Sequence, residues 1–356
     1  MSFRSDNAAF EAWLRRRCKV VEKDLKYKHE RMKESAFAFL RATFFRWAKR
    51  IETVCPDLAT APAVLSVGDV HLENFGTWRD AEGRIVWGIN DFDEAAVIPY
   101  PFDLVRLVTS ARLAPGLTVP SRVIAEMVLA GYRDGLEEPR PTLIDQHGLW
   151  MGDYVSGTSA DRRAFWDDIK ALNKKKAAAK PIPGAVKQGL RRSLPADAEV
   201  RFFAPRKRGG GSLGRPRYIV SAVWQGGRVI REAKALVPSA WSWAKNEKRP
   251  QIHFLALSTG RYRSPDPFLA IRGKFVYRRI APDARKVELD REAQAKLPER
   301  LLRAMGFDLG AIHAAAGKKT VAAILADLKA RPADWLNEAA GAAAADVERD
   351  YAEWKR

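Results

Sequence analysis

Three polar residues stand at a spacing that suits transfer of a phosphoryl group. Asp69 and Asn74 lie five residues apart after a short apolar run, and Asp91 follows a later one. Phosphoryl transfer needs a carboxylate that orients or deprotonates the acceptor hydroxyl, and oxygen ligands that hold Mg²⁺ on the phosphates. We therefore expect Asp69 to be the base, and we expect Asn74 and Asp91 to hold Mg²⁺.

The neighbours of these residues have more than one interpretation. Asp93 is either a second metal ligand or a loop carboxylate, and each Asp or Asn taken alone would be a turn or capping residue. His71 and Glu73 form the His-x-Glu pair of zinc deaminases, but the Pro-Cys-x-x-Cys motif of those enzymes is missing from the sequence. We therefore expect His71 to orient the loop through hydrogen bonds.

A glycine-rich segment occurs much later in the chain. Gly209, Gly211 and Gly214 satisfy the pattern G-x-G-x-x-G, with Ser212 among them. A dinucleotide-binding fold would need a helix directly afterwards, whereas residues 218–224 are typical of a strand. The glycines therefore lie between two strands, where backbone amides can approach a phosphate without hindrance from a Cβ atom. We expect these four residues to bind phosphate.

Lys234 lies on the next predicted strand after the glycine-rich segment. Its position matches that of a lysine that grips the α- and β-phosphates of a nucleotide. The alternative is an ordinary surface lysine beside a flexible loop. A carboxylate partner for Lys234 is not identifiable from the sequence, and Glu247 is only a candidate.

Hydrophobic periodicity and turn residues predict the elements that must position these side chains. Helical structure is expected over residues 8–50, 103–114, 121–136 and 239–247, and from about 288 to the end. Strands are expected over 63–67, 199–236 and 268–280, with a hairpin formed by 75–79 and 84–90. Residues 171–193 are interpreted as a connector.

Composition excludes several classes of protein. The chain has 356 residues, of which 47% are hydrophobic and 11 are Trp, so it is not a disordered chain. Cys18 and Cys55 are the two cysteines, which excludes a disulfide framework and a Cys-rich zinc site and favours a reducing cytoplasm. No apolar run approaches the ~20 residues that span a bilayer, so we expect no membrane partner.

The positive charge is concentrated in one segment. Residues 161–280 contain 28 basic and 8 acidic residues, a net charge of +20, against +19 for the whole chain. Such a segment attracts nucleotide phosphates, nucleic acid or an acidic partner, unless it is simply a solvated surface. No helix-turn-helix, zinc or RRM-type motif supports nucleic-acid binding. An acidic acceptor substrate or partner remains open.

Together these motifs resemble a protein-kinase-like fold with permuted connectivity, because the catalytic and metal loops precede the glycine-rich loop and the lysine. Phe102-Asp103-Leu104 after the Asp91 loop also resembles aminoglycoside phosphotransferases. That resemblance implies that Asp103 braces the catalytic loop rather than reacting. A late His313 is expected to be structural.

The motifs are similar, over most of the chain, to one bacterial group, the domain-of-unknown-function 2252 family. The residues that carry this resemblance are Arg31-Met32, Ser35–Arg41, Gly68–Gly76, Asn90–Glu94, Pro101–Arg106, the Gly-Ser-Leu-Gly segment, Lys234 with Pro238-Ser239, and His313-Ala314. The sequence does not reveal what the Arg31–Arg41 motif does.

The sequence thus predicts an α+β, bilobal, kinase-like fold. Residues 1–60 form an amino-terminal helical segment, 61–194 and 283–356 form the helical lobe, and 195–282 form the strand lobe. We expect an ATP- and Mg²⁺-dependent phosphotransferase whose acceptor, a small molecule or a protein, is unknown. The alternatives are AMP transfer by the same fold, and a non-catalytic nucleotide-binding pseudokinase or scaffold with a basic partner-binding lobe.

Overall fold

The amino-terminal segment consists of short helices in this computed structural model, which describes residues 2–151, 157–175, 181–207, 209–284 and 299–356. The helices are α1 (Phe3–Arg15), α2 (Glu22–Arg31), α3 (Ala36–Ala42) and α4 (Phe44–Val54). The predicted helical structure over 8–50 is therefore interrupted. Ser35 explains one of the interruptions, because its hydroxyl caps α3 by accepting a hydrogen bond from the backbone N–H of Ala38.

Short strands carry the loops in which the candidate residues lie. β1 (Ala63–Ser66) pairs antiparallel with β4 (Ala96–Pro99). β2 (Phe75–Arg79) and β3 (Ile85–Ile89) form the predicted hairpin, and β5 (Thr142–Leu143) pairs with β3. Because Phe75 is opposite Ile89, Asn74 and Asn90 meet at the open end of the hairpin, where the N–H of Asn90 donates to the Asn74 carbonyl at 3.0 Å.

Longer helices pack around these strands. They are α5 (Pro101–Arg112), α6 (Ser121–Glu137), α14 (Glu299–Ala314), α15 (Lys318–Ala330) and α16 (Trp335–Lys355), with the short α7 (Ile144–His147) beside β5. This confirms the predicted helices in the 103–114 and 121–136 regions. The expected carboxy-terminal helices are present from Glu299 onwards, whereas residues 288–298 lie outside the described residues.

Glycines let two of these helices cross closely. A Cβ atom at Gly131 of α6 would lie 1.8 Å from the Arg303 carbonyl of α14, and one at Gly310 would lie 2.2 Å from the Tyr132 carbonyl. No larger residue fits at such a distance. The glycines therefore fix the position of α14, which carries Asp308 and His313 toward the hairpin and α5.

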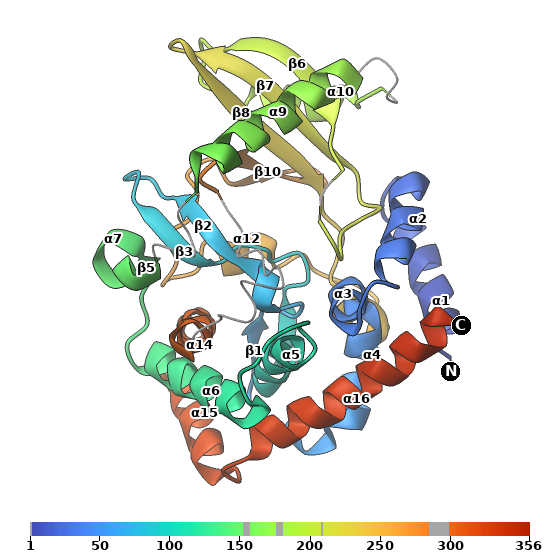
Figure 1. Ribbon diagram of the computed structural model, residues 1–356, viewed down its shortest axis with the longest axis vertical. Helices are drawn as coiled ribbons and strands as arrows, with labels where there is room; N and C mark the ends of the chain where they lie inside the picture. Colours follow the sequence, from blue (N-terminus) through green and yellow to red (C-terminus); the bar gives the residue numbers. More distant parts are fainter. Residues whose placement is uncertain (1, 152–156, 176–180, 208, 285–298) are drawn as a thin grey trace.

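The second part of the molecule is an antiparallel sheet in the order β6-β7-β8-β10-β9 (Figure 1). Its strands are β6 (Glu199–Pro205), β7 (Arg217–Trp224), β8 (Gly227–Ala235), β9 (Ala270–Arg272) and β10 (Phe275–Ile280). α11 (Ala240–Ala244) and α12 (Phe254–Ser258) connect β8 to β9. α11 lies within the helix expected over 239–247, and Ser239 caps it.

Two helices cover the faces of this sheet. Val186 and Leu190 of α10 (Gly184–Arg191) belong to one apolar cluster with Tyr277, and Ile169 of α9 (Ser159–Lys175) belongs to another with Ile230. The interpretation of residues 171–193 as a connector is therefore wrong for 171–175 and 184–191, and residues 176–180 lie outside the described residues. From here on, the strand lobe means this sheet together with α9 and α10, two helices that the sequence-based division placed in the helical lobe. The rest of the described chain is called the helical body.

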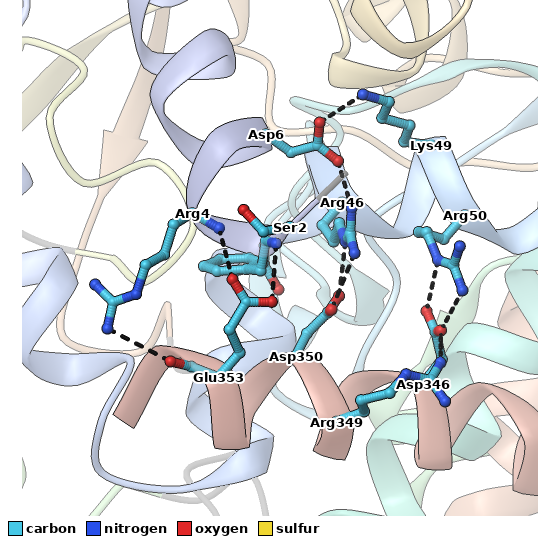
Figure 2. A network of polar contacts seen from close by, with 12 residues as sticks. Ser2, Arg4, Asp6, Arg46, Lys49, Arg50, Asp346, Arg349, Asp350 and Glu353 are labelled. Carbon is cyan, nitrogen blue, oxygen red and sulfur yellow. Dashed lines mark hydrogen bonds and ion pairs between the residues drawn. The ribbon is translucent and has the colours of Figure 1, made fainter. Parts of the chain in front are cut away.

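Buried ion pairs join the two ends of the chain. Arg46 of α4 bonds Asp350 of α16 at 2.7 Å and also contacts Asp6 of α1, while Arg50 bonds Asp346 at 2.7 Å (Figure 2). The chain is thus an α+β protein whose termini meet in the helical body (Figure 1). Of the helices described here, none is long and apolar enough to cross a membrane.

Candidate functional site

A cavity of about 660 Å³ lies between the strand lobe and the helical body, and residues of both line it. The candidate residues that line this cavity are Asp69, Asn74, Asp91, Asp93, Gly209, Gly211 and Ser212. Lys234 contacts Asp91 and Asp93 from the strand lobe. Gly214 differs from the rest, because it packs against Leu25 and Val20 of the amino-terminal segment.

Asp69 is fixed by a buried arginine. Its Oδ1 accepts a hydrogen bond from Nε of Arg106 at 2.9 Å and also contacts Nη2 of that side chain. Burial raises the pKa of Asp69 to about 6, although Arg106 opposes the shift. Among the described residues none donates to Oδ2, so this oxygen keeps its full capacity to accept a hydrogen bond from a ligand.

Asp103 holds the backbone that precedes Asp69, as the resemblance to phosphotransferases implied. Its carboxylate accepts from the N–H of Val67 at 2.7 Å and from the N–H of Gly68 at 2.9 Å. His313 lies 3.3 Å from the same carboxylate, and its other ring nitrogen lies 2.9 Å from the Tyr132 hydroxyl. These groups are buried and bonded to one another, an arrangement typical of a structural histidine.

The loop over residues 90–94, in which a metal ligand is expected, is called the metal loop below. Three buried oxygens in or beside it have no donor among the described residues: Asn74 Oδ1, Asn90 Oδ1 and Asp93 Oδ1. A buried oxygen without a donor costs free energy, and a bound cation would remove that cost. Within the described ranges, no three His, Cys, Asp or Glu side chains are grouped as a metal site. A cation site here would therefore combine fewer than three such side chains with other oxygen donors, such as an amide oxygen.

Lys234 is the partner of the metal-loop carboxylates. Its Nζ lies 3.2 Å from Asp91 Oδ1 and also contacts Asp93 Oδ2, and its side chain is only 3% exposed. It is therefore a buried ion-paired lysine and not a surface residue. Glu247, the candidate partner, lies elsewhere in an exposed turn, where its N–H donates to the Ser242 carbonyl.

Three arginines surround one buried carboxylate on the strand lobe. Glu232 stands two residues before Lys234 on β8, so both side chains lie on the same face of the sheet. Its oxygens accept from Arg206 at 2.9 Å, from Arg217 at 3.1 Å and from Arg278 at 2.8 Å. The arginines hold the pKa of Glu232 well below its usual value against the effect of burial. The cluster retains a net charge of +2 beside the cavity.

Arg215 connects the end of the glycine-rich loop to the metal loop. Its guanidinium contacts Glu94 at 2.5 Å and Asp93 at 3.3 Å, and these carboxylates overcome burial and raise its pKa. Glu94 also accepts from the N–H of Ala240 at 2.6 Å and, through its carbonyl, from the Ser239 hydroxyl at 2.9 Å. The metal loop is therefore held from both lobes.

The glycine-rich loop lies against the amino-terminal helices. A Cβ atom at Gly211 would be 2.8 Å from the Arg41 carbonyl and 3.3 Å from Asp69 Oδ2. Gly214 has φ of +93°, and its carbonyl accepts from the N–H of Val21 at 2.8 Å. Glycine is thus required at 211 for close approach and favoured at 214 by the left-handed backbone.

Sequence reasoning assigned no role to several residues of this site. Arg106 could have been found, because it stands one helical turn after Asp103 and faces the same loop. Glu232 could have been found from its alternation with Lys234 on one strand. From the sequence, Lys28 could meet a phosphate, although a solvated or packing role is preferred; in the structure it is buried and lines the cavity. Only tertiary packing reveals that position.

One family model matches this chain over residues 17–142, and its description is "Uncharacterized protein conserved in bacteria (DUF2252)". The matched segment contains the Asp69, Asn74 and Asp91 loops and the Arg31–Arg41 motif, whereas the glycine-rich loop, Lys234 and His313 lie outside it. No curated protein and no solved structure matched the chain. The family match therefore covers the segment that contains the Asp69, Asn74 and Asp91 loops, and it does not extend to the strand lobe.

Proposed function

We propose that this protein is an ATP- and Mg²⁺-dependent phosphotransferase with a permuted kinase-like fold. One observation carries the proposal: buried oxygens without donors at Asn74, Asn90 and Asp93 adjoin a cavity that also meets the Glu232 arginine cluster. Oxygen ligands suit a divalent cation, and surplus guanidinium groups suit phosphate oxygens. A nucleotide with its metal ion satisfies both sets of groups at once.

The topology supports the fold assignment. A glycine-rich loop joins β6 to β7, and Lys234 lies on β8 of the same antiparallel sheet, as in the strand lobe of a kinase. The catalytic and metal loops occur earlier in the chain, on the helical body. This order of elements supports a kinase-like fold with permuted connectivity.

Asn74, Asp91 and Asp93 would hold the Mg²⁺ ion. The ion, when bound, would neutralise charge on the phosphate oxygens. Lys234 and the amides of the glycine-rich loop would hold the phosphates. In the transfer, the acceptor hydroxyl oxygen forms a bond to the γ-phosphorus, the bond from that phosphorus to the β–γ bridging oxygen breaks, and ADP leaves. Asp69 Oδ2 accepts the hydroxyl proton, and Arg106 holds Oδ1 so that Oδ2 faces the acceptor.

The first experiment measures thermal unfolding with and without Mg-ATP. Ligand bound only to the native state stabilises it by about 2.7 kcal/mol at a hundredfold excess over Kd. We expect a clear shift for the wild type, a reduced one for Asp91→Ala and Lys234→Ala, and an unchanged one for Asp57→Ala, an exposed carboxylate remote from the cavity. No shift of the wild type at millimolar nucleotide would reject the nucleotide site.

The second experiment identifies the group that is transferred. Incubation with ATP labelled at the α- or the γ-phosphate, together with candidate acceptors, distinguishes the two reactions. Label from the γ position supports phosphoryl transfer. Label from the α position would replace the proposal with AMP transfer. Binding without transfer of either label, across acceptors, would favour the non-catalytic nucleotide binder.

A further inference from the structure

Lys28 is a buried lysine without an ion-pair partner in the part of the chain that the structure describes. It lies on α2, is 6% exposed and lines the cavity. The nearby charged groups that act on it are Arg215, Glu11, Glu94 and Asp69, and none of them is within ion-pair distance. A buried ammonium group that lacks a carboxylate costs free energy, so its presence beside a cavity points to a ligand.

Arg41 of α3 provides a second donor on the same cavity. Its Nη2 pairs with Glu73 at 2.5 Å, while its Nε is buried and has no acceptor among the described residues. The guanidinium also lies beside Gly210 of the glycine-rich loop, and the Arg41 side chain lines the cavity. Lys28 and Arg41 thus present unfilled donor capacity on the amino-terminal side of the cavity.

These two donors are not among the groups assigned to the nucleotide, although Arg41 borders the glycine-rich loop. The groups assigned to the nucleotide include the strand-lobe arginines, which Glu232 holds, and Lys234, which Asp91 and Asp93 hold. Lys28 and Arg41 come from the amino-terminal helices, and Asp69, the proposed base, acts electrostatically on both. A group bound by them would therefore lie near the position that the acceptor hydroxyl must occupy.

We infer that Lys28 and Arg41 form an acceptor subsite, and that the acceptor is a small molecule with an anionic group, a phosphate or a carboxylate, besides its hydroxyl. The inference rests on the proposed function. It gives the Arg31–Arg41 region, whose role the sequence left open, a part in recognising the substrate. Ammonium and guanidinium groups are the usual partners of both kinds of anion.

The test titrates two probes into the full chain saturated with Mg²⁺ and a non-hydrolysable ATP analogue, so that the nucleotide phosphate positions are filled. Sulfate represents a phosphate group and acetate represents a carboxylate. We expect one of the two to bind to the wild type, at least tenfold more weakly to Lys28→Met, and unchanged to Lys26→Met. Lys26 is the matched control because it is an exposed lysine of the same helix.

Whichever probe binds identifies the anion class. Equal affinity of Lys28→Met and wild type would overturn the inference, as would binding of neither probe at tens of millimolar. Competition between the probe and the ATP analogue would also overturn it, because the anion would then occupy a nucleotide position. If the analogue itself does not bind, the proposed function fails, and the same titration without nucleotide still tests Lys28.

A pH series on the wild type tests the inference without a variant. Burial lowers the pKa of Lys28 to about 8, and Arg215 adds to the shift while Glu11, Glu94 and Asp69 oppose it. Sulfate keeps its charge between pH 6 and pH 10, so its affinity should fall as the pH rises above 8. An affinity that stays constant to pH 9.5 would contradict binding by Lys28.

Discussion

At the scale of single residues, the proposed reaction depends on how Asp69 is buried. A base works best when its pKa is close to the working pH, and burial raises the pKa of Asp69 to about 6. The bond from Arg106 keeps the carboxylate oriented while it leaves one oxygen available. Arg106 thus positions the Asp69 carboxylate, and burial raises its pKa.

The first prediction concerns this carboxylate. We expect kcat/KM for transfer to fall as the pH drops below about 6, because protonated Asp69 cannot accept the hydroxyl proton. Asp69→Asn should lower transfer by roughly 10²–10⁴-fold and leave Mg-ATP affinity unchanged. Initial rates and a binding titration measure the two effects, with Asp57→Asn as the control. A rate that is flat down to pH 5 would exclude Asp69 as the base.

Lys28 gives a second prediction, for stability. Its pKa is 10.5 when exposed and about 8 in the fold, so between these values the unfolded chain binds more protons than the native one. Wild-type stability should therefore rise with pH through this window relative to Lys28→Met, by roughly 3 kcal/mol in total. Urea unfolding at pH 7 to 10 measures the difference, and Lys26→Met should follow the wild type. Parallel curves for Lys28→Met and the wild type would contradict the burial of the charge.

At the scale of elements, the glycine-rich loop is fixed by what it contacts. Gly211 approaches both the Arg41 carbonyl and Asp69, and Gly214 accepts a hydrogen bond from the start of α2. The loop therefore connects the strand lobe to the amino-terminal helices as well as adjoining the cavity. The position of the glycine-rich loop therefore depends on its contacts with α2 and α3, although these helices lie far from it in the sequence.

The third prediction tests that contact. Gly211→Ala should destabilise the fold by about 1–3 kcal/mol or displace the loop, because the new Cβ would lie 2.8 Å from a backbone carbonyl. Mg-ATP affinity should fall with it. Gly184→Ala is the matched control, since nothing lies within 4 Å of its Cβ position. Denaturant unfolding and nucleotide titration report both quantities, and a Gly211→Ala protein equal to wild type in both would show that the loop is not constrained there.

At the scale of the whole molecule, ion pairs between distant segments hold the helical body together. Arg46 is bonded to Asp6 and to Asp350, so it joins α4 to both ends of the chain (Figure 2). Removing one partner of a buried pair leaves an uncompensated charge. The amino-terminal helices that carry Lys28 and Arg41 are therefore anchored through the carboxy-terminal helix.

The fourth prediction follows from that anchoring. Asp350→Ala should lower the free energy of unfolding by about 3 kcal/mol, because both it and Arg46 are largely buried. Arg349→Ala, whose side chain is 65% exposed beside Asp346, should cost less than about 1 kcal/mol. Urea unfolding of the two variants gives the comparison. A similar small effect for both would mean that Arg46 relies on Asp6 alone.

Local sequence patterns are enough to predict many of the short elements and the types of residue at the candidate site. Residues 75–79 and 84–90 predicted the hairpin because turn residues separate two apolar runs, and that hairpin brings Asn74 and Asn90 together. The spacing of Asp69, Asn74 and Asp91 identified three residues that line one cavity. These features depend on short-range geometry, which a single segment specifies.

How the segments meet depends on tertiary contacts. Nothing local shows that Lys28 is buried beside the cavity, that Arg106 holds Asp69, or that Lys234 pairs with the metal-loop carboxylates. Residues 171–193 were interpreted as a connector because basic residues are frequent there and the apolar positions are few. Two of those apolar positions, Val186 and Leu190, pack α10 onto the sheet. Burial and ion pairing are properties of two surfaces in contact, and the residues that form them are up to 304 positions apart.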